Sequence, residues 1–159
     1  YKVTTSNNIE TIRNADKIVM PGVGHFGKAI ENLKQLNLID VLNKEVLENK
    51  KPILGICLGM QLMASSSEEG NVKGLNWFDA TVEKFKINNQ LLHKVPHTGW
   101  NQININKESK LLKNIPNNSE FYFVHSYFFP IWLGSHKESR PRRSFAPNFL
   151  KYSSCLLEI

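Results

Sequence analysis

The feature that most constrains the fold is a cysteine set between two glycines at the end of a short apolar run. The run leads into Gly55-Ile56-Cys57-Leu58-Gly59, and the residues that follow can form a helix. With serine in the central position, this pattern is a nucleophile elbow, a sharp strand-to-helix turn that raises the nucleophile above the sheet edge. Glycine on both sides leaves room for a strained turn and for close packing. The pattern therefore predicts a strand that ends at Cys57 and a helix that begins directly after it.

Two interpretations of Cys57 follow from this local pattern. At a helix N-terminus the partial positive charge favours the thiolate, which is the nucleophilic form of cysteine. The backbone amide of Leu58 would point the same way and could donate a hydrogen bond to an oxyanion. Alternatively, Cys57 is a buried structural residue on a core strand, because free cysteine is among the most buried residue types.

Length and cysteine usage narrow the class of protein. A chain of 159 residues is expected to form one domain with a sizeable core. It has no apolar run of membrane-spanning length and no secretory signal pattern. Cys57 and Cys155 are too far apart and too few to form a disulfide framework, so a reducing cytoplasm is the expected location.

The net charge of +6 is unevenly distributed. Three of the four arginines, Arg140, Arg142 and Arg143, lie in residues 131–159, where the composition changes from Lys- and Asn-rich to Arg-, Ser- and Pro-rich. Such a cluster could bind a phosphate backbone, although a solvated surface is the commoner explanation. We therefore expect a domain over residues 1–130 and an atypical basic tail over 131–159. A disordered tail, a change of reading frame and a fragment junction all remain possible origins for it.

The order of the expected elements indicates an α/β fold. Residues 1–5 and 17–20 are typical of strands, and residues 9–14, 26–36 and 39–47 have helical patterns. Strands alternating with helices predict a parallel sheet with helices on its faces. Beyond residue 70, the segments 77–87, 102–105 and 120–128 are typical of strands without intervening helices, which indicates a mixed or antiparallel extension.

A glycine-rich segment precedes the first long helical pattern. Gly22-Val23-Gly24-His25-Phe26-Gly27 fits the dinucleotide-binding pattern G-x-G-x-x-G. However, Pro21 interrupts the turn, and Asp40, the candidate ribose ligand, falls inside a helical pattern. The alternative is a turn that places backbone N–H groups beside an active site on the neighbouring strand.

Four segments, in this order along the chain, resemble the class I glutamine amidotransferases. They are Pro21–Gly24, Gly55–Gln61, Lys94–Asn101 and Phe121–Tyr127. The last two narrow the resemblance to the glutaminase subunits of imidazole glycerol phosphate synthase. The resemblance implies a three-layer α/β domain with a mainly parallel sheet and helices on both faces.

The resemblance also implies roles for the residues around the elbow. Cys57 would attack the side-chain amide carbon of glutamine, expel ammonia and form a thioester that water then hydrolyses. The amides of Val23 and Leu58 would stabilise the oxyanion. Gly22 and Gly24, which belong to the substrate site, would permit close approach of the backbone.

Two further groups of residues are implied by the resemblance. The amino-acid end of glutamine would be held by Gln61, His125, Ser126 and Tyr127. A synthase partner that consumes the ammonia would face Pro96, His97, Trp100 and Asn101. The same histidines and aromatic residues could instead have structural roles. Since His97 and His125 have no partners at metal-ligand spacing, no metal or other cofactor is expected.

The sequence departs from the family pattern at the catalytic base. The family takes this base from a later His-Pro-Glu segment, but none of the five histidines here is followed by proline. Only His136-Lys137-Glu138 has the His-x-Glu spacing, which makes His136 the candidate for the base and Glu138 the candidate for the carboxylate that orients it. The family also begins with a strand and a helix before the segment that matches Tyr1, so the resemblance implies a chain incomplete at both ends.

The expected function is that of a glutaminase subunit in a cytoplasmic heterodimer. It would release ammonia from glutamine for a cyclase in histidine biosynthesis. One alternative is a related glutaminase that supplies an amidating enzyme of surface-polysaccharide synthesis. Another is a catalytically defective fragment that lacks the family His-Pro-Glu segment.

Overall fold

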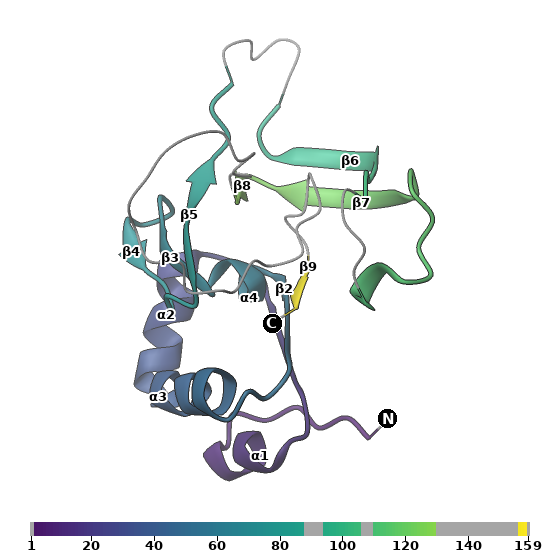
Figure 1. The fold of residues 1–159 in the computed structure, drawn as a ribbon. Helices are drawn as coiled ribbons and strands as arrows, with labels where there is room; N and C mark the ends of the chain where they lie inside the picture. The colour runs from purple at the N-terminus through teal and green to yellow at the C-terminus, as the bar shows by residue number, and fades with distance from the viewer. Residues whose placement is uncertain (1, 88–93, 106–109, 130–155, 159) are drawn as a thin grey trace, which may run out of the picture.

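The computed structural model describes residues 2–87, 94–105, 110–129 and 156–158, and Figure 1 shows their arrangement. The helical segments come mostly from the first half of the chain. They are α1 Ile9–Asn14, α2 Phe26–Gln35, α3 Leu38–Asn43, the π-helical turn η1 Lys44–Glu48, α4 Leu58–Gln61 and the 3-10 turn η2 Lys110–Leu112.

The strands form three sheets within the described residues. The strands are β1 Ile18–Gly22, β2 Ile53–Cys57, β3 Ala64–Ser67, β4 Val72–Lys73, β5 Phe78–Lys84, β6 His97–Gln102, β7 Glu120–His125, β8 Tyr127–Phe128 and β9 Leu156–Glu158. Their orders are β1-β2-β9, β4-β3-β5-β8 and β6-β7. The pairs β1–β2 and β3–β5 are parallel, whereas β2–β9, β3–β4, β5–β8 and β6–β7 are antiparallel.

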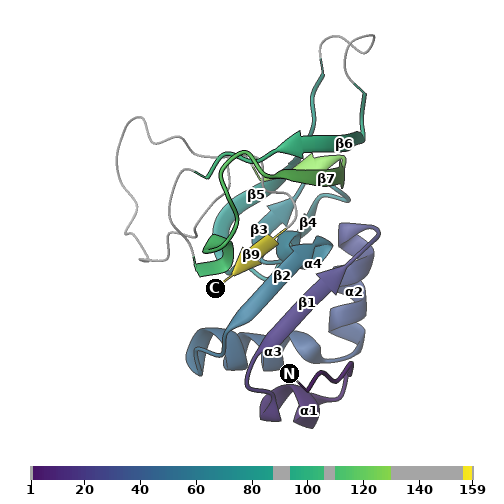
Figure 2. The same ribbon diagram turned by 90° about the vertical axis from the view of Figure 1, so that its right-hand side faces the viewer.

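Helices α2 and α3 cover one side of the β1–β2 pair, as the two perpendicular views in Figures 1 and 2 show. Helix α2 begins at Phe26 because two side chains accept its first amide protons. His25 Nδ1 accepts from the amide of Gly27 at 3.1 Å, and Glu69 Oε2 accepts from the amide of Phe26 at 2.7 Å. The helix buries Phe26 and Ile30 toward the sheet.

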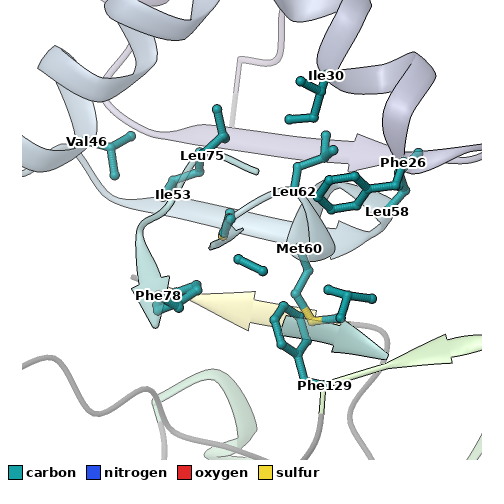
Figure 3. Close-up of a cluster of buried hydrophobic side chains, with 13 residues drawn as sticks. Phe26, Ile30, Val46, Ile53, Leu58, Met60, Leu62, Leu75, Phe78 and Phe129 are labelled. Atoms are coloured by element: carbon teal, nitrogen blue, oxygen red, sulfur yellow. The ribbon is translucent and has the colours of Figure 1, made fainter. Parts of the chain in front are cut away.

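The core lies between these helices, the strands and α4 (Figure 3). Each of its fully buried large side chains is less than 2% exposed: Phe26, Ile30, Ile53, Met60, Met63 and Val82. Two of these, Met60 and Met63, belong to α4 and the turn after it. The core therefore directly supports the helix that follows Cys57.

Several expectations about the fold are confirmed. The helical patterns at 9–14, 26–36 and 39–47 correspond to α1, α2 and α3 with η1, and the strand at 17–20 corresponds to β1. The segments 77–87 and 120–128 contain β5, β7 and β8, which form the predicted mixed and antiparallel extension.

Two strand predictions are wrong. Residues 2–5 form no strand, since they alternate in polarity but pair with no neighbour among the described residues, and Val3 is 84% exposed. The strand expected at 102–105 instead spans His97–Gln102, where β7 supplies its hydrogen-bond partners.

The fold class is a mixed α/β arrangement of several sheets. The second helical layer of the predicted three-layer domain is not seen in the part of the chain described, and it stays a prediction. In the expected tail, β9 pairs with β2, while residues 131–155 and 159 lie outside the described residues. No helix of the described part is long and apolar enough to cross a membrane.

Candidate active site

Cys57 lies at the turn between β2 and α4, where the sequence predicts a nucleophile elbow. Its φ of 51° and ψ of −118° are rare for a residue with a Cβ atom. Residues held in such conformations typically store about 1–3 kcal/mol of strain and gather at functional sites. The thiol is free, and the residue is partly exposed. The elbow is therefore formed, and Cys57 is not the fully buried structural cysteine of the alternative interpretation.

The glycines on either side of Cys57 allow α4 to pack directly against the sheet. A Cβ atom on Gly55 would lie 2.6 Å from the Cα atom of Met60. A Cβ atom on Gly59 would overlap the carbonyl oxygen of Met20 in β1. Both contacts involve backbone that cannot easily move, so the predicted close packing at these glycines is confirmed.

The glycine-rich turn after β1 lies beside this elbow. In the parallel register of β1 and β2, Gly22 pairs with Cys57. Val23 follows at once and is 92% exposed, while Gly24 has a φ of 104°. Leu58 is the first residue of α4, and amides of a first helical turn have no partner within the helix. The amides of Val23 and Leu58 thus belong to turns at the same sheet edge, and their role as oxyanion donors stays a prediction.

Gln61, His125 and Tyr127 meet at one carbonyl group, that of Tyr127. Gln61 Nε2 donates to this oxygen at 3.4 Å, and His125 Nδ1 lies 3.1 Å from it. Gln61 is only 7% exposed and ends α4. Between the other two residues, the carbonyl of Ser126 accepts from the amide of Phe85 at 3.0 Å. The structure therefore groups, at α4, the four residues that the resemblance assigns to the amino-acid end of glutamine.

His97 and Asn101 join this group through the hydrogen-bonded ribbon of β6 and β7. His97 pairs with His125 across the two strands, and His97 Nδ1 lies 3.2 Å from His125 Nε2. Asn101 Nδ2 lies 2.6 Å from His97 Nε2. The family resemblance implied a partner interface for His97 and substrate binding for His125, but the strand register that joins the two residues was not predicted.

Trp100 lies on the opposite face of the ribbon. It pairs with Tyr122, and their ring centroids are 5.6 Å apart in an edge-to-face arrangement. Trp100 is 68% exposed and Tyr122 is 51% exposed. Tyr122 was not among the predicted site residues, because its segment is typical of a core strand. Alternation along the strand from buried Phe123 could have shown that it faces outward.

The surroundings of His125 favour its neutral form. Burial lowers the pKa of His125, and the nearby His97 lowers it further, whereas the hydrogen bond to the Tyr127 carbonyl acts in the opposite direction. Phe85, which was also not among the predicted site residues, packs against His125 with the ring centroids 5.0 Å apart.

The base candidates His136 and Glu138, like the cluster of Arg140, Arg142 and Arg143, lie outside the described residues. Within the described residues, no three His, Cys, Asp or Glu side chains gather as a metal ion would require.

The fold and the site together define an α/β protein with a cysteine elbow at the carboxyl end of a parallel strand. The family model for class-I glutamine amidotransferases matches residues 1–139. The chain belongs to the class-I glutamine amidotransferase family.

Three similar proteins are all named as the HisH subunit of imidazole glycerol phosphate synthase. The chain is 50% identical over 128 residues to imidazole glycerol phosphate synthase subunit HisH 2 of Methanococcus maripaludis, covering 80% of this chain and 62% of that protein. It is 46% identical over 127 residues to subunit HisH 2 of Vibrio vulnificus, covering 79% and 58%. It is 47% identical over 124 residues to subunit HisH 1 of Campylobacter jejuni strain 81-176, covering 77% and 61%. The chain thus matches about three fifths of the length of these curated relatives.

Proposed function

We propose that this chain is the glutaminase subunit of an imidazole glycerol phosphate synthase, which releases ammonia from glutamine for histidine biosynthesis. The observation that carries the proposal is the strained elbow conformation of Cys57 at the edge shared by β1 and β2. Family membership and the names of the similar proteins support it. We further propose that the complete domain has the three-layer form that the resemblance implies.

The proposed reaction begins with the sulfur of Cys57. The thiolate attacks the amide carbon of glutamine, and the carbonyl electron pair moves onto oxygen, where the amides of Val23 and Leu58 would donate hydrogen bonds. When the oxyanion collapses, the carbon–nitrogen bond breaks and nitrogen leaves as ammonia, having taken the proton that the thiol gave up. Water then attacks the thioester and releases glutamate. By spacing, His136 and Glu138 are the candidates for moving the protons.

The aromatic pair of Trp100 and Tyr122 supports a role in binding the synthase subunit. Two large rings, more than half exposed and set edge to face, form the kind of anchor that dominates protein interfaces. Pro96, directly before β6, is also exposed. We propose that this face of the ribbon, together with Pro96, contacts the partner that receives the ammonia.

The direct test measures glutamine-dependent ammonia release with a cyclase subunit of the synthase present. Wild type should release ammonia, Cys57→Ala should not, and Trp100→Ala should weaken the response to the cyclase without loss of folding. If Cys57→Ala retained the wild-type rate, Cys57 would not be the nucleophile. If the wild type released none, the alternative of a catalytically defective chain would be favoured.

A further inference from the structure

The inward face of the β6–β7 ribbon carries three polar side chains that are hydrogen-bonded in a row. Asn101 Nδ2 lies 2.6 Å from His97 Nε2, His97 Nδ1 lies 3.2 Å from His125 Nε2, and His125 Nδ1 lies 3.1 Å from the carbonyl oxygen of Tyr127. Antiparallel pairing of His97 with His125 places both rings on the same face of the ribbon.

The chemistry of the groups fixes the direction of this row. A carbonyl oxygen only accepts, so His125 Nδ1 must carry the proton that binds Tyr127. Neutral His125 then accepts at Nε2, which requires the proton of His97 to be on Nδ1. His97 Nε2 is left as an acceptor for the Asn101 amide. With both rings neutral, this is the one arrangement that makes every bond in the row.

The row continues to the elbow helix. The Tyr127 carbonyl also accepts from Nε2 of Gln61, at 3.4 Å, and Gln61 is the last residue of α4. Around the row, the His125 ring packs against Phe85 and the His97 ring stacks on Phe123, with centroids 5.0 and 5.8 Å apart. Such partly buried hydrogen bonds hold their partners more firmly than exposed ones do.

We propose that His97 and Asn101 are positioning residues for the glutamine site, fixing the His125 tautomer and thereby the Tyr127 carbonyl and Gln61 that would hold the amino-acid end of glutamine. This inference rests on the proposed function. It gives the two faces of the ribbon different roles. Trp100 and Tyr122 on the outward face would contact the partner, while His97 and Asn101 on the inward face act within the chain.

Two probes of Cys57 in the full 159-residue chain test this role. Iodoacetamide reports only the access and reactivity of the thiol. A glutamine analogue with a chloromethyl ketone in place of the carboxamide must first bind, after which the Cys57 sulfur displaces chloride. For His97→Ala we expect the half-saturating concentration of the analogue to rise about fivefold, as loss of one hydrogen bond implies, with the maximal labelling rate and the iodoacetamide rate unchanged.

Three further variants separate positioning from a general loss of structure. His97→Gln can still donate to His125 and accept from Asn101, and should restore most of the affinity for the analogue. Asn101→Ala removes only the exposed end of the row, so the half-saturating concentration of the analogue should rise less than in His97→Ala, and the fold should be unaffected. Lys34→Ala, a substitution at an exposed position of α2 that has no assigned role in the site, should match the wild type.

Nitrogen-15 NMR of the imidazole rings gives a readout that does not depend on glutamine binding. Both rings should be protonated at Nδ1 in the wild type, and either ring in the Nε2-protonated form would overturn the proposal. The positioning proposal would also be overturned if labelling by the analogue were saturable and His97→Ala had the same half-saturating concentration as the wild type. That result would leave the glutaminase proposal intact. If the analogue labelled the wild type no faster than iodoacetamide does, there would be no glutamine site and both proposals would fail.

Discussion

Cys57 has a backbone conformation that glycine adopts freely and other residues do not, so the elbow should limit the stability of the chain. We predict that Cys57→Gly is more stable than Cys57→Ala, because only glycine has no Cβ atom to strain at φ 51° and ψ −118°. Because both variants lack the sulfur atom, the difference between their free energies of unfolding reports the effect of the Cβ atom on the backbone. Neither variant should release ammonia from glutamine.

The size of the effect follows from two opposing contributions. Relief of the strained conformation should contribute about 1–3 kcal/mol. The greater freedom of glycine in the unfolded chain should cost about 0.5–1 kcal/mol relative to alanine. The net gain is about 1 kcal/mol, which for a chain of this length raises the melting temperature by about 2–4 °C.

Urea unfolding followed by tryptophan fluorescence provides the assay, since the Trp77 indole donates to Asn43 Oδ1 at 2.7 Å and is partly buried against the core. The same pair of substitutions at Ile56, in the paired strand β2, serves as the control. There the glycine variant should be the less stable of the two, by about 0.5–1 kcal/mol. If Cys57→Gly were no more stable than Cys57→Ala, the elbow would not be strained and the reasoning would be refuted.

Two further predictions concern the support of the site. Gly59→Ala should lower the free energy of unfolding by about 1–3 kcal/mol, because its Cβ atom would overlap the Met20 carbonyl. Gly27→Ala is the control, because only side chains lie near that position, and its stability should be close to that of the wild type. Equal urea midpoints for the two variants would contradict this prediction. Lys51 Nζ lies 2.9 Å from Glu45 Oε2 in a nearly buried pair, and its hydrogen bond holds the pKa of Glu45 below the ordinary value of 4.5. Since the folded pKa is lower than the unfolded one, this stabilisation is present above about pH 4.5 and is lost as the pH falls through the folded value. Glu45→Gln should therefore reduce the fall in melting temperature on acidification. If the melting temperature of this variant depended on pH as that of the wild type does, the Glu45–Lys51 pair would not be the cause of the acid destabilisation.

The sequence predicted those parts of the site that depend on local geometry. Glycines at 55 and 59 around a cysteine leave room for close strand-to-helix packing, and the structure has that packing. Apolar residues at helical spacing likewise located α2 and α3, because this periodicity is local and does not depend on pairing with distant segments.

What the sequence did not predict depends on pairing between distant segments. The His97–His125 contact is set by the register of two strands that are 28 residues apart along the chain. Nothing local in either segment specifies that register. The strand expected at residues 1–5 is not formed over residues 2–5 for a related reason, because alternating side chains make no strand unless another strand completes its hydrogen bonds.

The same dependence on register governs the proposed oxyanion site. Val23 and Leu58 lie in turns that follow different strands, and their amides can serve one oxygen atom only if those strands end together. The pairing of Gly22 with Cys57 provides this common end. Since successive residues of a strand face opposite sides, a slip of one residue would turn the glycine-rich segment to the other face of the sheet. Packing of Gly59 against the Met20 carbonyl opposes such a slip, because this close contact holds α4 against one particular residue of β1. The glycine that makes the elbow possible therefore also aligns the neighbouring strand that would complete the site.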